Sequence, residues 1–218
     1  LLIIKQSCCM NHILLTVGEK RKSEEKYKRE GKKVMSKAGR IEIVCGPMFS
    51  GKSEELLRRL KRARIAKKKY KLFKPSVDDR YSETEVVSHS GERLECQVLQ
   101  ASLHLSDQFN LERDTEIVAF DEAQFFGVQL LSVATSLAAM GKRVIIAGLD
   151  MDSRGTPFGP MPELMAVAEE VLKLTAVCEA CGEPATHTYR VTKEEKEQIL
   201  VGASEHYQAR CRDHWCSR

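Results

Sequence analysis

The sequence predicts an α/β protein with a doubly wound, mostly parallel sheet and a small metal-stapled segment after it. Three observations support this fold class. Apolar, strand-like runs alternate with helical patterns between residues 41 and 172. A glycine-rich loop joins the first strand-like run to the first helical one. Two pairs of metal-ligand residues follow residue 175, each pair with a two-residue spacer.

The glycine-rich loop is Gly46–Ser53, which matches the phosphate-binding pattern G-x-x-x-x-G-K-[ST]. Its residues are Gly46, Pro47, Met48, Phe49, Ser50, Gly51, Lys52 and Ser53. The N–H groups of such a loop and the positive end of the following helix favour bound phosphate. Lys52 can reach the β- and γ-phosphates, and Ser53 can place its hydroxyl on Mg²⁺. We therefore expect a sheet of the P-loop NTPase type rather than an accidental glycine-rich turn.

Composition and charge narrow the classes of function. The chain has 218 residues, enough for one α/β domain and a small appendage. No apolar run approaches the roughly 20 residues of a membrane helix, so we expect no membrane partner. Residues 1–37 hold ten Lys and Arg against four Glu, whereas the remainder holds 25 basic against 27 acidic residues. The predicted folded part is thus nearly neutral, and its charge gives no support to nucleic-acid binding.

Residues 1–35 differ from the rest, with apolar residues lacking clear periodicity followed by a charge-rich stretch. We interpret them as a disordered extension or as upstream translated sequence, with Met35 as a natural start. A targeting peptide fits less well, because the basic block follows the apolar part and contains glutamates. The predicted domains are then 36–174, which binds nucleotide, and 175–218, a metal-binding lid.

The remaining elements are predicted in chain order from periodicity and turn residues. We expect helices over 54–69, 101–109, 127–140 and 161–172, strands over 41–45, 70–75, 116–120 and 142–148, a hairpin over 86–96 and a loop over 149–160. The basic residues of 54–69 are interpreted as a solvated helix face, with a nucleic-acid surface as the alternative.

Charged residues follow two of the predicted strands. Asp121 and Glu122 end the strand at 116–120, a Walker-B-like pattern in which Asp121 holds Mg²⁺. The alternative is a helix cap, since 123–126 opens the next predicted helix. Asp78 and Arg80 follow Pro75. Because ligands bind beyond the carboxyl ends of parallel strands, these side chains are expected near the phosphate-binding loop.

The two ligand pairs are Cys178-x-x-Cys181 and Cys211-x-x-His214. Thiolates suit Zn²⁺, and a tetrahedral site stabilises a segment that is too small for a core of its own. A redox C-x-x-C pair is the alternative, which the second pair disfavours. Cys216 is a spare thiol that competes with His214 for the fourth position. The placement of the eight cysteines predicts a reducing, cytoplasmic compartment rather than a disulfide framework.

Taken in order, these motifs resemble the type II thymidine kinases, the cellular, zinc-containing class. The motifs are Gly46–Ser53, Asp78-Asp79-Arg80-Tyr81, Asp121-Glu122-Ala123-Gln124-Phe125-Phe126, Gly148-Leu149-Asp150, Pro157-Phe158-Gly159 and the two zinc pairs. The resemblance covers about Arg40 to His214. It implies transfer of the ATP γ-phosphate to the 5′-hydroxyl of thymidine, and of deoxyuridine too. It also implies a homotetramer that is inhibited by dTTP.

The resemblance assigns roles to individual residues. Glu122 is the general base, Lys52 and Arg80 stabilise the transferring phosphoryl group, and Mg²⁺ is held by Ser53, Asp121 and Asp78. The thymidine site is drawn from nine residues: Met48, Phe125, Leu149, Phe158, Thr188, Arg190, Val201, Gly202 and Tyr207. Core packing is the alternative for Met48, Leu149 and Phe158. A lid over about Val191 to Tyr207, anchored by structural zinc, is implied to close over the base.

The sequence departs from the family pattern at two places, and three rival functions are compatible with parts of it. His214 stands where many relatives have cysteine, and Asp152-Ser153-Arg154-Gly155 is a polar version of its loop. The rivals are a kinase with a different nucleoside range, a zinc-containing ATPase that binds nucleic acid, and a non-catalytic nucleotide sensor. The near-neutral charge of the predicted folded part disfavours the ATPase that binds nucleic acid. Glu122 beside Asp121 disfavours the non-catalytic sensor.

Overall fold

The computed structural model describes residues 38–76, 85–87, 93–100, 111–191 and 206–216. All of them belong to one compact unit, Lys37–Arg218. The predicted extension at 1–35 and the predicted helix at 101–109 lie outside the described residues. Within the described ranges, no helix has the length and apolar character required to span a bilayer.

A central six-stranded sheet, parallel throughout, confirms the predicted α/β fold class. Its order is β5-β2-β6-β7-β1-β8. The strands are β1 (Arg40–Cys45), β2 (Tyr70–Pro75), β5 (Gln97–Leu99), β6 (Ile117–Phe120), β7 (Arg143–Gly148) and β8 (Glu170–Lys173). The strands predicted from apolar runs are all present, whereas the edge strands β5 and β8 were not predicted.

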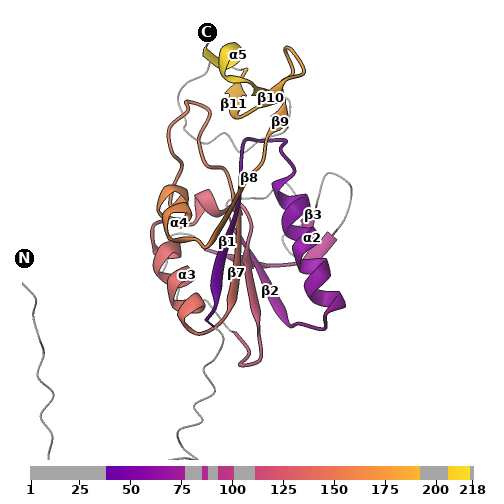
Figure 1. The fold of residues 1–218 in the computed structure, drawn as a ribbon, viewed down its shortest axis with the longest axis vertical. Coiled ribbons are helices and arrows are strands. Elements are labelled where there is room, and N and C mark those ends of the chain that lie inside the picture. The colour runs from indigo at the N-terminus through magenta and orange to yellow at the C-terminus, as the bar shows by residue number, and fades with distance from the viewer. Residues whose placement is uncertain (1–37, 77–84, 88–92, 101–110, 192–205, 217–218) are drawn as a thin grey trace, which may run out of the picture. The chain divides into compact units, whose positions relative to one another are not determined.

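Helices cover both faces of this sheet (Figure 1). They are α2 (Lys52–Ile65), the 3₁₀ turn η2 (Ala123–Phe125), α3 (Gln129–Ala139) and α4 (Met161–Val167). One core packs α3 and α4 against alternate strand residues such as Ile43 and Phe120. The other core packs α2 against the intervening residues, such as Val44 and Ala119. The period of two along each strand therefore sends side chains into both cores, as a doubly wound sheet requires.

Short elements complete the described chain. The hairpin predicted over 86–96 is present as antiparallel β3 (Glu85–Val87) and β4 (Arg93–Glu95). After β8, two small antiparallel pairs and a short helix form what we call the metal module. Its elements are β9 (Ala176–Val177), β10 (Pro184–Ala185), β11 (His187–Arg190), β12 (Tyr207–Arg210) and α5 (Arg212–Cys216).

The helix predicted over 161–172 is wrong in its second half. The helix ends at Val167, Ala168 is extended, and Glu170–Lys173 forms strand β8 beside β1. The apolar spacing of this stretch fits a helix, but the open edge of β1 offers backbone hydrogen bonds that a helix would leave unused. The Glu169 carboxylate also accepts a 2.6 Å bond from the Ile41 N–H. Tertiary pairing thus overrides local propensity here.

Two further helix boundaries differ from the prediction. The helix predicted over 54–69 begins at Lys52 and ends at Ile65, because Lys67 adopts a left-handed conformation with φ of 55°. Residues 123–126, predicted to open the next helix, instead form the separate turn η2. The turn breaks the chain direction directly after Asp121 and Glu122, which becomes important for the site.

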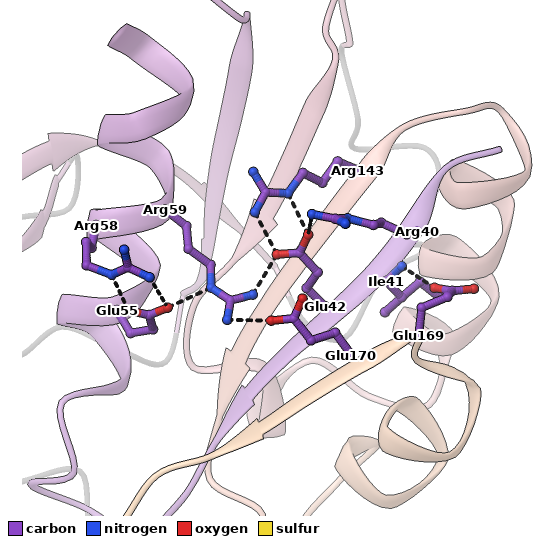
Figure 2. A network of polar contacts seen from close by, with 9 residues as sticks. All are labelled: Arg40, Ile41, Glu42, Glu55, Arg58, Arg59, Arg143, Glu169 and Glu170. Carbon is purple, nitrogen blue, oxygen red and sulfur yellow. Dashed lines mark hydrogen bonds and ion pairs between the residues drawn. The ribbon is translucent and has the colours of Figure 1, made fainter. Parts of the chain in front are cut away.

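A buried carboxylate, Glu42, anchors the amino end of the sheet (Figure 2). It is fully buried in the middle of β1, on the face covered by α2. Its oxygens lie 2.6 Å from Arg59 Nη1 and 2.7 Å from both Arg143 Nε and Nη2. Arg40 Nη2 lies 2.5 Å from Glu42 Oε1. Arg59 also forms an ion pair with Glu170, with 2.8 Å between Nη2 and Oε1. One carboxylate therefore links α2 to β1, β7 and β8.

The arginines keep Glu42 ionised. Burial alone would raise its pKa, but hydrogen bonds and charge from Arg143, Arg59 and Arg40 outweigh burial and lower the pKa below 4.5. A surface pocket of about 370 Å³ beside α2 is lined by six residues: Glu42, Arg58, Arg59, Arg62, Arg143 and Glu170. It lies at the amino ends of the strands, so this pocket is separate from the phosphate-binding edge.

We expect Glu42→Gln to lower the free energy of unfolding by about 3–5 kcal/mol, because it removes the buried negative charge that pairs with Arg40, Arg59 and Arg143. Glu116→Gln, which removes an exposed pair with Lys68, should cost less than about 1 kcal/mol. Urea unfolding monitored by circular dichroism measures both values.

The same pair of variants gives a pH test. Since the folded-state pKa of Glu42 is lowered, its stabilisation is present above pH 4.5 and is lost as the pH falls below that value. The Glu42→Gln variant should therefore lose less stability than the parent chain between neutral and acid pH. Equal losses in both chains would contradict the assigned role of Glu42.

Candidate active site and metal centre

The phosphate-binding loop follows β1 at the carboxyl edge of the sheet. Gly46 has φ of 143°, and a Cβ there would lie 2.4 Å from the Leu174 carbonyl oxygen. Gly51 has φ of 81° and caps the N-terminus of α2. Phe49, between them, also adopts a left-handed conformation with φ of 66°. The loop thus turns in the way that the two glycines allow, and its last residues begin α2.

Lys52 lies within this loop, and its Nζ donates a 2.7 Å hydrogen bond to the Pro47 carbonyl. Burial lowers the pKa of its ammonium below the ordinary 10.5. The carboxylates that oppose this shift are those of Glu122, Asp121 and Asp150. The sheet therefore gathers several carboxylates around one lysine, all from the carboxyl ends of β6 and β7.

Ser53 and Asp121 meet across the site, with Ser53 Oγ donating a 3.0 Å hydrogen bond to Asp121 Oδ2. Asp121 is buried and directly follows β6. A hydroxyl and a carboxylate side by side are the hard oxygen donors that Mg²⁺ takes in nucleotide sites. The chemistry of this pair thus fits the predicted ion.

Glu122 is held by its neighbours at the sharp turn after β6. It is in the left-handed region, with φ of 49° and ψ of 44°. Its N–H donates to Asp121 Oδ1 at 3.0 Å, and its Oε2 accepts a 2.6 Å bond from Gln124 Nε2. A non-glycine residue in this conformation costs roughly 1 kcal/mol or more, which the surrounding contacts offset. The carboxylate is half-buried, so it is both oriented and accessible.

Gln124 also ties Glu122 to the loop after β7. Its Oε1 accepts a 2.9 Å hydrogen bond from the Leu149 N–H, and its side chain is buried. The neighbouring rings of Phe125 and Phe158 pack edge to face, with centroids 5.6 Å apart. Both rings and Leu149 are only partly buried. These three predicted thymidine-site residues are therefore brought together at a surface, and core packing does not account for their exposure.

The hairpin of β11 and β12 supplies a second group of predicted thymidine-site residues. Thr188 and Arg190 are two apart on β11, and Tyr207 pairs with Arg190 across the hairpin, so all three share one face. On that face, Thr188 Oγ1 accepts a 3.0 Å bond from the Met48 N–H. The hairpin thus contacts the phosphate-binding loop directly.

The metal module holds a compact cluster of four ligand residues. The ligand atoms of Cys178, Cys181, Cys211 and His214 all lie within 4.8 Å of one another. Cys181 Sγ is 3.8 Å from Cys211 Sγ, and Cys211 Sγ is 3.1 Å from His214 Nδ1. Two thiolates 2.3 Å from a tetrahedral Zn²⁺ would be about 3.8 Å apart, whereas a disulfide would bring them to about 2 Å. The spacing therefore fits a metal site.

The pKa of Cys178 suits a cation as well. Burial would raise the pKa of Cys178, but backbone N–H groups of Cys211, Ala180 and Cys181 lower it to about 6. A thiol with this pKa is a thiolate at neutral pH, which is the form that binds metal. Cys216 is exposed, and the cluster is completed by His214 instead.

The metal module and the phosphate-binding loop share a small core. Cys178 packs with Ala176, Ala185 and Ala209, and the ring of Phe49 packs against this group. A core of alanines and one cysteine buries little apolar surface. Closure of the metal cluster is therefore expected to supply much of the stability of this module.

A family model for thymidine kinase matches residues 39–215, which include the phosphate-binding loop, the Asp121-Glu122 pair and all four cluster residues. The chain belongs to the thymidine kinase family. Membership makes it a kinase and supports phosphorylation of thymidine as its general activity. ATP and thymidine are the substrates that the family implies.

Several predicted site residues of this thymidine kinase family member are not described by the structure. Asp78, Arg80, Val201 and Gly202 lie outside the described residues. The described residues Gly46–Ser53, Asp121, Glu122, Phe125, Leu149 and Phe158 gather at the carboxyl edge of the sheet. Thr188, on β11 of the metal module, contacts the phosphate-binding loop at Met48. Arg190 and Tyr207 lie on the same face of the β11–β12 pair as Thr188. Their ligand roles stay predictions.

Sequence reasoning gave no role to several residues around the site. Gln124 bridges Glu122 and Leu149, and only its position two residues after the acidic pair pointed to it. Asp150 is buried, pairs with Lys173 at 2.6 Å through Oδ2, and has an Oδ1 without a hydrogen-bond partner in the described structure. The Gly148-Leu149-Asp150 motif was the signal for this carboxylate. Its partner was missed because β8 was predicted to be helical.

We expect the purified kinase to hold one Zn²⁺ per chain, since the described residues contain one such cluster. His214→Ala should lose the metal because it removes a ligand, whereas Cys216→Ser should retain it. Metal content after gel filtration, measured by plasma mass spectrometry, distinguishes the two. Loss in Cys216→Ser with retention in His214→Ala would reverse the assignment of the fourth ligand.

Proposed function

We propose that this protein is a type II, zinc-containing thymidine kinase that transfers the γ-phosphoryl group of ATP to the 5′-hydroxyl of thymidine. The products are dTMP and ADP, and deoxyuridine is a second substrate. The observation that carries the proposal is the oriented carboxylate of Glu122, held by Gln124 beside Lys52 and the Ser53–Asp121 pair. A sensor that only binds nucleotide has no need of a base at this point.

The proposed reaction assigns one step to each group. Glu122 accepts the proton of the 5′-hydroxyl while the 5′-oxygen of the nucleoside forms a bond to the γ-phosphorus of ATP. The bond between the γ-phosphorus and the oxygen that bridges it to the β-phosphorus breaks, and ADP is released. Lys52 and the loop N–H groups stabilise negative charge on the phosphoryl oxygens, with Arg80 as a further cation. Bound phosphate also offsets the burial that lowers the pKa of Lys52.

Magnesium is proposed to be held by Ser53 and Asp121, with Asp78 as a further ligand. The ion supplies charge neutralisation of the β- and γ-phosphates when it is bound with ATP. The 3.0 Å contact between Ser53 Oγ and Asp121 Oδ2 supports this assignment, because both oxygens already face one point.

For the nucleoside, we propose a site between the loop after β7 and the metal module. Phe125, Phe158 and Leu149 offer an apolar wall for a pyrimidine and its methyl group, and Met48 and Thr188 adjoin it at the phosphate-binding loop. Arg190, Tyr207, Val201 and Gly202 are assigned to a lid over Val191 to Tyr207. The zinc cluster would then fix the base of this lid.

The remaining proposals rest on the ordered motifs rather than on contacts. They are feedback inhibition by dTTP, assembly into a homotetramer and a cytoplasmic location in pyrimidine salvage and DNA precursor synthesis. The free thiols of all described cysteines accord with a reducing compartment.

The activity is tested by coupled ADP release with Mg-ATP and a panel of thymidine, deoxyuridine, deoxycytidine and deoxyadenosine. Turnover confined to thymidine and deoxyuridine is expected, because the family implies thymidine as the substrate and deoxyuridine differs from it by one methyl group. If zinc-loaded protein shows no turnover with any nucleoside, the kinase proposal fails, and nucleic-acid-stimulated ATP hydrolysis becomes the next assay.

Glu122→Gln should reduce kcat by about 10²–10⁴-fold, because it removes the proton acceptor while keeping a similar shape. The KM for ATP should stay within about twofold, since Gln cannot alter the phosphate-binding loop backbone. Glu163→Gln, an exposed glutamate on α4, is the matched control and should behave as the parent enzyme. Full activity in Glu122→Gln would remove the assignment of the base.

A further inference from the structure

The contact between α5 and the loop after β7 has no assigned role in the reaction proposed above. Trp215, the single tryptophan of the chain, lies on α5 next to the cluster residue His214. Its Nε1 donates a 3.4 Å hydrogen bond to the Ser153 carbonyl, and its ring stacks on His187 with centroids 4.7 Å apart. The indole thus lies between the metal module and residues 151–157.

The fit of the indole against this loop requires glycine. A Cβ at Gly155 would lie 2.7 Å from the Cη2 and 3.0 Å from the Cζ2 atom of Trp215. Gly155 also has φ of 77°, a conformation that side chains rarely adopt. The backbone and the ring therefore approach more closely than any larger residue would permit.

The loop that receives the indole is closed by its own hydrogen bonds. Asp152 Oδ1 accepts 2.9 Å bonds from the N–H groups of Arg154 and Thr156, and Met151 forms an antiparallel bridge with Pro157. These bonds join the two arms of the loop and limit their independent movement. A contact at Gly155 is therefore transmitted to the residues at both of its ends.

Those ends carry the proposed nucleoside wall. Leu149 precedes the loop and bonds to Gln124, which holds Glu122. Phe158 follows the loop, and its N–H bonds to the Asp150 carbonyl at 3.1 Å. The position of the loop therefore sets the position of the wall relative to the general base.

At the other end of the contact, the cluster fixes the indole. The Trp215 N–H donates a 2.9 Å bond to the carbonyl of Cys211, so its backbone position depends on the Cys211–His214 turn. The cluster residues Cys211 and His214 thus lie at the two ends of the turn that precedes Trp215.

We propose that Trp215 is a positioning residue that couples the metal cluster to nucleoside binding, by holding residues 151–157 so that Leu149 and Phe158 face the substrate. This inference rests on the proposed function, since it concerns the same nucleoside site. In this proposal the metal module contacts the nucleoside site in two places. One is the proposed lid, and the other is the Trp215 contact that positions the wall formed by Leu149 and Phe158.

The first experiment follows the emission of Trp215, which is the only indole in the protein. Removal of zinc from the full chain with a chelator should shift the emission to longer wavelength, because the ring leaves Gly155 and His187 for solvent. Restored zinc should reverse the shift. Far-ultraviolet circular dichroism checks that the sheet remains folded. An unchanged spectrum, with zinc shown to be gone and the sheet intact, would overturn the coupling.

The second experiment measures kinetics of zinc-loaded variants. Trp215→Ala should raise the KM for thymidine about tenfold or more, the scale expected when a binding group is displaced by a fraction of an ångström. The KM for ATP and the zinc content should stay within about twofold of the parent. Trp215→Phe, which keeps an aromatic ring on His187, should recover most of the affinity. Cys216→Ser is the neighbouring control and should match the parent enzyme.

A double-mutant cycle isolates the contact itself. Gly155→Ala should raise the KM for thymidine in the parent, where its methyl group meets the indole, but much less in the Trp215→Ala background. The backbone strain at Gly155 is common to both backgrounds and cancels. Independent effects of the two substitutions, or equal rises in KM for thymidine and ATP, would overturn the inference.

The outcomes separate this inference from the proposed function. If the parent enzyme does not phosphorylate thymidine, the proposed function fails, while the emission experiment still reports whether the cluster and loop are coupled. If the parent is active and Trp215→Ala binds thymidine normally, the positioning role fails alone.

Discussion

Parallel pairing of every strand in the central sheet is the constraint on which the rest of the structure depends. Because β1, β6, β7 and β8 all end at one edge, the phosphate-binding loop, the Asp121-Glu122 pair, the loop after β7 and the entry to the metal module emerge together. β8 has the largest effect on this arrangement. By pairing with β1, it places the Leu174 carbonyl against Gly46, where a Cβ would approach within 2.4 Å. The metal module therefore begins beside the loop that it later contacts through Thr188 and Phe49.

The carboxylates at the two ends of the sheet differ in how fully they are paired. At the amino end, Glu42 is surrounded by arginines that satisfy both of its oxygens, and its pKa is lowered. At the carboxyl end, Asp121, Glu122 and Asp150 all act on Lys52, and Asp150 is also paired with Lys173 through Oδ2. Among the described residues, no group donates a hydrogen bond to the Oδ1 atom of Asp150. The first arrangement is complete without a ligand and serves the fold. The second gathers three carboxylates beside Lys52 and Lys173, which suits a site that takes a divalent cation together with a nucleotide.

The parts of this structure that were predictable from sequence are those whose signals are local. The run Tyr70–Pro75 ends at a proline, and β2 has the same bounds. The metal cluster was predictable because two pairs of ligand residues, each with a two-residue spacer, are typical of a structural zinc site. By contrast, residues 161–172 carry a helical apolar pattern throughout, and only the open edge of β1 determines that 170–173 become a strand. Gln124 and Trp215 act through residues far away in the chain, Leu149 and Ser153, so no local pattern could assign them. In the polar loop Asp152–Gly155, the Asp152 side chain accepts the hydrogen bonds that close the loop on itself.

The unequal sizes of the cores explain why the chain combines a motif loop with a metal cluster. The sheet and its helices bury two extensive apolar clusters. The core cluster of the metal module holds only three alanines and Cys178, so apolar burial stabilises the module far less than it stabilises the sheet. Its position is instead fixed at separate points: the metal cluster within it, Phe49 and the Met48–Thr188 hydrogen bond at the phosphate-binding loop, and Trp215 at Gly155. A module held by a few specific contacts rather than by a large core depends on each of them. Under the proposed function, loss of the contact at Met48 or at Gly155 would alter a wall of the nucleoside site.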